Sequence, residues 1–179
     1  MQFLLGVARL IDWFNEKVSL IAVWLVLASC LVSAANAGLR YVISQSSNAW
    51  LEMQWYMFAG IVMLGAAFVY KVNEHVRVDV VYGRLASRRR AWIDLLGTIF
   101  FLLPVAFVLT WLSWPFFVDA WVTDEMSSNA GGLARWPAKL AIPLGFALLL
   151  LQGVSEIIKR IGYLRGEFEM ETHYERPLQ

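Results

Sequence analysis

The chain has 179 residues, of which 59% are hydrophobic and 16% charged, and its formal net charge is +1. Soluble domains usually carry about 25% charged residues, so this composition indicates a membrane protein. A single cysteine, Cys30, excludes an internal disulfide framework and a CxxC redox pair. The two histidines, His75 and His173, lie outside the apolar runs, so a buried haem or clustered metal site would lack ligands.

Motifs of the common enzyme classes are also missing. The sequence contains no Gly-rich phosphate loop, no nucleophile elbow and no HExxH motif. We therefore expect no enzyme activity, no catalytic residue, and no cofactor or metal bound to this chain. We expect the chain to contact membrane lipids and not to bind nucleic acid.

Residues 1–17 are predicted to form an amphipathic helix that lies in the membrane interface. Apolar residues such as Phe3 and Leu10 recur at helical spacing, whereas Arg9, Asp12 and Glu16 fall on the other side. The alternative interpretation is a plain extension of the first membrane helix.

Four apolar runs are predicted to cross the membrane, so the predicted fold class is an all-α membrane protein. The first run is free of charge and reaches about 33 Å at 1.5 Å per residue, enough for the hydrocarbon core. Pro104 and Pro115 are predicted to kink or end the third helix. The predicted spans, within a transmembrane domain of residues 18–160, are 18–39, 50–70, 92–118 and 137–158.

Small residues recur every four positions in the first span. They form two ladders: Ser29, Ser33 and Ala37, and Cys30, Ala34 and Gly38. Small side chains let helices approach closely in lipid, so we expect this face to pack against protein.

Two polar residues, Glu52 and Gln54, open the second span. A carboxylate in the first turn of a helix complements the helix dipole and reaches the lipid headgroups. The sharper interpretation is that Glu52 is a polar anchor to another helix, because a charge near the membrane edge avoids most of the cost of burial.

The basic segment 71–90 separates the second and third spans. Cytoplasmic loops carry the excess of Lys and Arg, which places this segment inside the cell. Only Arg40, Arg135 and Lys139 then lie in outer segments. Both termini are therefore predicted to be cytoplasmic, and residues 161–179 are predicted to be a polar cytoplasmic tail.

Within this segment His75, Arg77 and Asp79 alternate with valines. The alternation fits a short extended segment as well as an interfacial helix. On a helix, His75 and Asp79 would share a face. We expect these three side chains to tie the segment to span ends or to a partner protein.

The remaining charged residues are predicted at span ends. Asp94 is expected in the first turn of the third span, where it would face the helix dipole. Lys139 and Glu156 are expected to reach opposite interfaces from the fourth span. The outer loop is predicted at 119–138, and the chain from Lys159 onward is expected to be loosely ordered.

Four short motifs occur in order along the chain. They are Glu52-Met53-Gln54, His75-Val76-Arg77-Val78-Asp79, Glu125-Met126-Ser127, and Trp136 followed by Ile142-Pro143-Leu144-Gly145. With four spans, these motifs resemble the small membrane subunit, the DctQ-like component, of tripartite ATP-independent periplasmic (TRAP) transporters over residues 18–160. The candidate motif and partner-interface residues are Glu52, Gln54, His75, Arg77, Asp79, Glu125, Ser127, Trp136 and Pro143.

The resemblance implies a multi-pass subunit of the bacterial cytoplasmic (inner) membrane. In such a transporter a periplasmic substrate-binding protein delivers a small solute, usually an organic acid anion. A larger polytopic membrane subunit translocates it and binds the sodium ions whose gradient drives uptake. The small subunit would brace the scaffold of the large one.

The positions of charged residues are compatible with this supporting role. A transport site normally places ionisable groups or broken helices near the bilayer midplane, yet Glu52, Asp94 and Glu156 are all predicted at span ends. One alternative is a self-contained small oligomeric transporter or channel, in which Glu52 would face a pore. A membrane enzyme or a quinone or haem protein is disfavoured by the missing histidines and cysteines.

Overall fold

The computed structural model describes residues 1–44, 47–73, 82 and 85–168, and these residues are mostly helical. Apart from the helices they include an isolated antiparallel bridge between Met126 and Ala134. The helices are α1 (Gln2–Ile43), α2 (Asn48–Val72), α4 (Ser87–Gly97), η1 (Thr98–Leu102), α5 (Leu103–Val122) and α6 (Trp136–Leu164). Within the described ranges, four helical stretches are long and apolar enough to cross a membrane. This result confirms the all-helical class and the four predicted spans.

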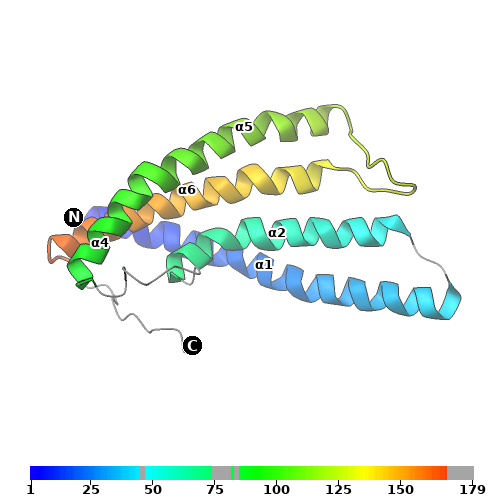
Figure 1. Cartoon of the computed structure of the whole chain (residues 1–179), viewed down its shortest axis with the longest axis horizontal. Helices are drawn as coiled ribbons and strands as arrows, with labels where there is room; N and C mark the ends of the chain where they lie inside the picture. Colours follow the sequence, from blue (N-terminus) through cyan, green and yellow to red (C-terminus); the bar gives the residue numbers. More distant parts are fainter. Residues whose placement is uncertain (45–46, 74–81, 83–84, 169–179) are drawn as a thin grey trace.

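The helices run side by side along the long axis of the molecule (Figure 1). α1 packs against α2 and α6, α2 also packs against α6, and α5 packs mainly on α6. The start of α1, the end of α2, the start of α4 and the end of α6 meet at one end, here called the amino-terminal end. The opposite end, here called the loop end, holds the end of α1, the start of α2 and the loop 123–135.

α1 is a single helix with no break at the predicted boundary after residue 17. Its 42 residues extend over about 63 Å at 1.5 Å per residue, twice the usual hydrocarbon thickness of about 30 Å. Residues 1–17 are therefore continuous with the first span. Phe3 and Leu10 are exposed, whereas Asn15 is buried, so this part of α1 turns a polar side toward the protein.

The third span is helical from Ser87 to Val122, so neither Pro104 nor Pro115 ends it. A π-helical turn, η1, comes directly before Pro104, and the backbone N–H of Leu103 donates to the carbonyl of Thr98, five residues earlier. Proline has no N–H and its ring crowds the preceding turn, so a local widening of the helix is the expected accommodation. Asp119 was predicted to begin the outer loop, but it lies in α5.

Close helix contacts depend on glycines of α6. A Cβ atom added at Gly145 would lie 2.6 Å from the Cβ of Met63 on α2. One at Gly153 would lie 2.8 Å from a methyl group of Leu103 on α5. Glycine therefore sets the distances at which α2 and α5 approach α6.

The predicted packing face of α1 is mostly uncovered within the chain. Ser29 is buried, but the other members of the two ladders are exposed: Cys30, Ser33, Ala34, Ala37 and Gly38. A Cβ atom at Gly38 would meet no other atom within 4 Å. The prediction that this face packs against protein therefore concerns a partner, apart from Ser29.

Candidate functional site

The first polar cluster, at the loop end, is built around Glu52, which is only 3% exposed. One carboxylate oxygen accepts hydrogen bonds from the hydroxyl of Ser127 and, at 2.7 Å, from Nδ2 of Asn129. The other accepts from the backbone N–H of Leu133 at 2.7 Å. Glu52 is thus an anchor, as the sharper interpretation proposed, but it holds the loop 123–135 and not another helix.

The position of Glu52 on its helix also departs from the expectation. α2 begins at Asn48, and its N-cap is Ser47, whose hydroxyl accepts from the backbone N–H of Ala49. Glu52 therefore lies beyond the first turn, where the helix dipole has little effect. Its contacts with the loop, and not the dipole, account for its burial.

Glu125 supports the same loop from the other side. Its carboxylate pairs with Lys139 and, at 3.0 Å, with Nη1 of Arg135. Hydrogen bonds from Lys139 and then Arg135 lower the pKa of Glu125 below its ordinary value. The ammonium of Lys139 lies 3.9 Å from the centre of the Phe116 ring. Lys139 is thus paired with a loop residue at the loop end, and its expected approach to the membrane interface stays a prediction.

Aromatic packing joins α5 to α6 at the loop end. The rings of Trp121 and Trp136 meet edge to face, with centroids 4.6 Å apart. Pro143 is fully buried about two turns further along α6. Gln54 is half-buried on α2, outside this cluster. Of the predicted motif residues, the structure thus brings together Glu52 with Ser127 and places Glu125 and Trp136 at the same end.

The predicted residues of the basic segment, His75, Arg77 and Asp79, lie outside the described residues. Their expected role in tying that segment to span ends or to a partner stays a prediction.

A second polar cluster joins α1 to α6 near the amino-terminal end. Gln152, with no exposed surface, accepts from Nδ2 of Asn15 and donates to Asp12, both at 2.8 Å. Asp12 also accepts from the hydroxyl of Ser155 at 2.6 Å and pairs with Lys159 at 3.0 Å. Each of these side chains therefore has at least one hydrogen-bond or ion-pair partner, either on the facing helix or on its own helix.

The cluster continues from α6 to α4. Glu156 is 3% exposed and pairs with Lys159 and Arg160. Nη2 of Arg160 lies 3.4 Å from Asp94, which also accepts from the Tyr82 hydroxyl at 2.7 Å. The ion pairs thus link the fourth span to the start of the third.

Three expectations about these residues are wrong. Glu156 is buried among cations of its own helix, because pairing with them is cheaper than leaving one charge unpaired in an apolar region. Lys159 and Arg160 belong to α6, which continues to Leu164 into the region predicted as tail. Asp94 lies two turns inside α4 and contacts Arg160, so it does not cap the helix.

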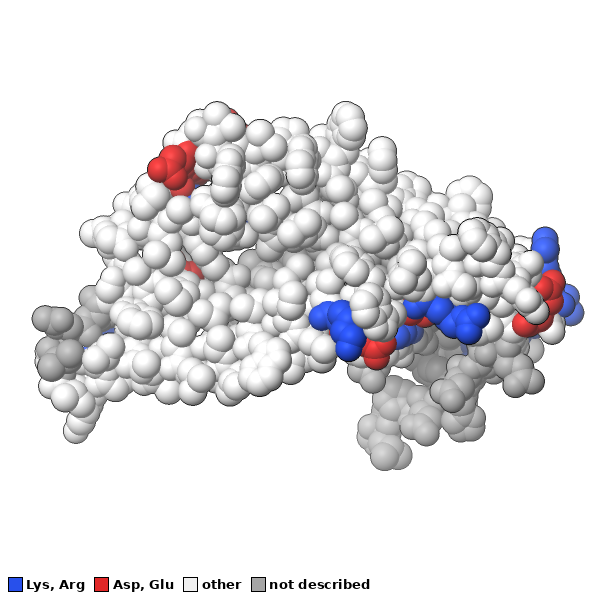
Figure 2. Space-filling view, turned by 180° about the vertical axis from the view of Figure 1, so that it is seen from behind, with Lys and Arg blue, Asp and Glu red and all other residues white. Residues whose placement is uncertain are grey.

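Charged side chains are concentrated near the amino-terminal end. Figure 2 shows that Lys and Arg gather over this end on one face, while the rest of that face is mostly uncharged.

In the part of the chain that the structure describes, no group of three or more His, Cys, Asp and Glu side chains is arranged to hold a metal ion. The two clusters connect helices and a loop, and their chemistry is that of structural anchors.

Comparison with protein families gives a match over most of the chain. Residues 29–162 match the family described as "Tripartite ATP-independent periplasmic transporters, DctQ component". The matched region runs from the middle of α1 to the end of α6 and includes both polar clusters apart from Asp12 and Asn15. No curated protein and no solved structure matches the chain.

Proposed function

Because this chain belongs to the DctQ components of tripartite ATP-independent periplasmic transporters, we propose that it braces the scaffold of a larger translocating membrane subunit. The transporter would use a sodium gradient to take up a small solute, an organic acid anion, delivered by a periplasmic binding protein. The family match over most of the chain carries this proposal.

The distribution of charges supports a bracing role. Coupled transport sites place ionisable groups or unwound backbone near the bilayer midplane. The described ionic clusters lie toward the two ends of the helices. The sodium ions would therefore bind the large subunit.

The charge asymmetry supports an orientation in the bacterial inner membrane. The amino-terminal end and the tail carry most of the Lys and Arg residues, so they would face the cytoplasm. The loop end, with Glu52 and Glu125 holding the loop 123–135, would then face the periplasm, where the binding protein docks. The exposed small residues of α1 would supply part of the surface that packs against the large subunit.

The contacts of Glu52 argue against a self-contained channel. Such a channel would need this carboxylate to face a pore, but both of its oxygens accept hydrogen bonds from the loop. An oligomer of this chain alone thus lacks an obvious ion-coordinating group at this position.

Affinity purification of the chain in mild detergent from its native host, followed by mass identification, tests the proposal. We expect a larger polytopic membrane protein in equimolar amount. Reconstitution of both subunits in liposomes with the periplasmic binding protein should then give solute uptake that needs an inward sodium gradient. A stable homo-oligomer without a partner, or uptake by this chain alone, would contradict the proposal.

A further inference from the structure

The first four turns of α1 expose an apolar side. Leu10 is 65% exposed, Trp13 56% and Phe14 45%. At 3.6 residues per turn, these side chains lie on the side of the helix opposite to Asp12 and Asn15. The family match begins at residue 29, so this segment lies outside the matched region. Such an apolar side needs a cover that the described chain does not supply.

Contacts with α6 hold that side outward. On the opposite side of α1, the amide of Asn15 donates to Gln152 at 2.8 Å, and Asp12 pairs with Lys159 at 3.0 Å. Asn15 is buried, and Gln152 has no exposed surface. These partners fix the rotation of α1 about its own axis, because turning the helix would leave buried polar groups unpaired. The apolar side therefore points away from the protein.

The apolar side lies at the depth of the lipid headgroups. The charge-free stretch of α1, residues 18–39, is about 33 Å long and fills the hydrocarbon core of about 30 Å. Trp13 and Phe14 precede it by about 6–8 Å along the same unbroken helix. The headgroup layer on each side of the core is about 5–8 Å deep, and tryptophan is enriched there. Leu10, one turn further from the core, reaches the outer edge of this layer when the helix is tilted.

Two cations flank the tryptophan on this side. Arg9 and Lys17 lie one turn before and one turn after Trp13, and we call these three residues the basic stripe. Arg9 and Lys17 are exposed, and among the described residues neither has an ion pair. Nε of Arg9 donates to the carbonyl of Leu5 in its own helix, at 3.4 Å. The basic stripe therefore carries two uncompensated positive charges.

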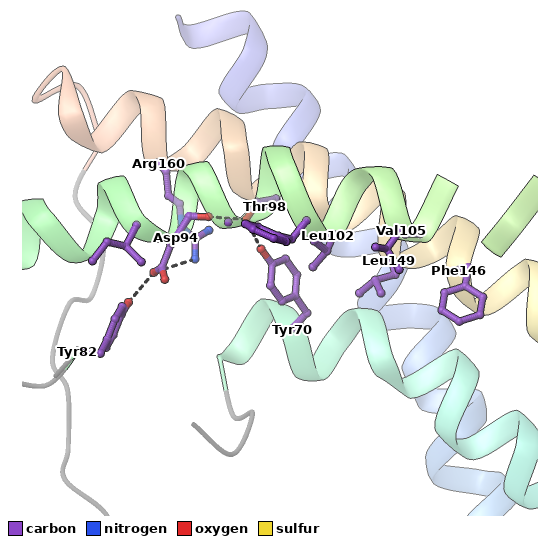
Figure 3. A pocket seen from close by; sticks show the side chains of 13 residues that line it. Tyr70, Tyr82, Asp94, Thr98, Leu102, Val105, Phe146, Leu149 and Arg160 are labelled. Atoms are coloured by element: carbon purple, nitrogen blue, oxygen red, sulfur yellow. Dashed lines mark hydrogen bonds and ion pairs between the residues drawn. The ribbon is translucent and has the colours of Figure 1, made fainter. Parts of the chain in front are cut away.

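Carboxylates of the same end are paired inside the protein. Besides Asp12, Glu16 pairs with Lys71 at 3.3 Å. Asp94 pairs with Arg160 at 3.4 Å in the polar wall of a pocket of about 630 Å³, which lies between α2, α6 and the third span (Figure 3). The apolar wall of that pocket includes Leu102, Val105, Phe146 and Leu149. These carboxylates therefore do not compensate the basic stripe.

Further cations of this end also lack an ion pair among the described residues. They are Arg88, Arg89 and Arg165, against one carboxylate in the same situation, Glu167. Figure 2 shows the resulting concentration of Lys and Arg. Anionic phospholipids attract such a surface, and each Lys or Arg close to the headgroups strengthens binding about fivefold. A second copy docked through the same side would instead bring the cations of two basic stripes together, which is unfavourable.

We propose that the basic stripe and the apolar side chains next to it, Leu10 and Phe14, bind anionic phospholipids in the headgroup layer. The cations contact phosphate oxygens, and the apolar side chains insert beside the upper parts of the acyl chains. The site rests on the chain crossing a membrane and not on its assembly into a transporter. Failure of lipid binding would therefore leave the proposed function intact, and failure of partner capture would leave the lipid site intact.

Quenching of a single fluorophore by labelled lipids tests the site. Cys30→Ser removes the only cysteine of the sequence, and Phe14→Cys then carries a nitrobenzoxadiazole group next to the basic stripe. The purified full chain is reconstituted in phosphatidylcholine vesicles with a small fraction of phosphatidylglycerol or phosphatidylcholine that carries a nitroxide on the upper part of an acyl chain. Both labelled lipids should quench the fluorophore, and phosphatidylglycerol should do so at least about fivefold more effectively.

Removing the two cations should abolish the preference for the anionic lipid. Arg9→Gln combined with Lys17→Gln should reduce the preference to less than about twofold, while both lipids still quench the fluorophore. Arg40→Gln is the matched control and should leave the preference unchanged, because Arg40 is also an exposed cation of α1 but lies about 46 Å from Arg9 along the helix. If circular dichroism shows that the double variant loses helix content, Lys17→Gln alone replaces it and should reduce the preference about fivefold.

Three results would overturn the proposal. The first is a fluorophore at residue 14 that neither lipid quenches, although one at Leu31→Cys, in the middle of the span and 62% exposed, is quenched. The second is equal quenching by the two lipids with the cations in place, which would show that they do not select the headgroup. The third is loss of quenching when the large subunit is present, or a disulfide between two copies of Phe14→Cys, which would show that protein covers this side.

Discussion

Replacing Gln152 by Leu tests the polar cluster between α1 and α6. Gln152 is completely buried and makes two hydrogen bonds to α1, one with Asn15 and one with Asp12. Leucine has a similar size, so Gln152→Leu removes the hydrogen bonds with little change in packed volume. The amide of Asn15 would keep only a contact of 3.5 Å with the carbonyl of Leu148.

The expected loss of stability follows from these two bonds. Hydrogen bonds between membrane helices contribute about 0.6 kcal/mol on average and up to about 1.7 kcal/mol. Gln152→Leu should therefore lower the free energy of unfolding by about 1–3 kcal/mol. Asn15→Leu should lower the free energy of unfolding by less than Gln152→Leu does. The double variant should lower it by less than the sum of the two single variants, because each single variant leaves the other side chain without its hydrogen-bond partner.

Unfolding in mixed micelles with increasing dodecyl sulfate, followed by fluorescence of the nine tryptophans, measures these losses. Leu151→Met is the control, because Leu151 is on the same helix but is 43% exposed to the surroundings. Its effect should be close to zero. A change for Gln152→Leu below about 0.3 kcal/mol, or strictly additive single variants, would refute the assigned role of the hydrogen bonds.

Four further predictions concern the loop, the packing and the assembly. Glu52→Ala should speed proteolysis of the loop 123–135 without unfolding the helices, because this carboxylate holds three loop donors. Hydrogen bonds from Lys139 and Arg135 lower the pKa of Glu125. The stability that Glu125 gives to the loop should therefore be complete above the ordinary pKa of a glutamate and should be lost as the pH falls through the lowered pKa. Proteolysis of the loop should accelerate over the same pH range. Gly145→Leu should cost about 1–3 kcal/mol or more in the micelle assay, because its side chain would overlap α2. Ser33→Leu should reduce capture of the large subunit while leaving the stability of the isolated chain unchanged, because Ser33 is exposed.

Each of these has a distinct control. Glu125→Gln should remove the pH dependence of loop proteolysis, and a persistent dependence would assign it to another group. Equal proteolysis of wild type and Glu52→Ala at neutral pH would show that the loop does not depend on this carboxylate. Gly6→Leu should leave stability unchanged where Gly145→Leu lowers it. If Ser33→Leu still captures the partner in full, that face of α1 contacts lipid.

The four spans were predictable because membrane insertion depends on local composition. A run of about 20 apolar residues crosses the hydrocarbon core whatever its neighbours are, so the spans could be located from hydropathy alone. Helix ends were less predictable. α6 continues through Lys159 and Arg160 because both cations are paired with carboxylates on α1, α4 or α6 itself.

The loop anchor was predictable only in part. One of the two interpretations made Glu52 a polar anchor, but to another helix, and its partners Ser127, Asn129 and Leu133 in the loop lie more than seventy residues away. The spacing of Glu156 and Arg160, four residues apart, was a signal for their ion pair. Nothing local pointed to Asp12 as the partner of Lys159, since that contact depends on how α1 is rotated against α6.

The sequence by itself determined that the chain is an all-helical membrane protein with four spans, because each span needs only its own apolar residues. The order of the motifs along the chain also pointed to the family that the comparison then identified. Only the tertiary structure decided that one polar cluster holds the loop 123–135 on α2 and another joins α1 to α6, and that a pocket with a polar and an apolar part lies between the helices. These features depend on the relative rotation and spacing of distant helices, which side chains such as Gly145 and Gly153 set through packing and not through local pattern.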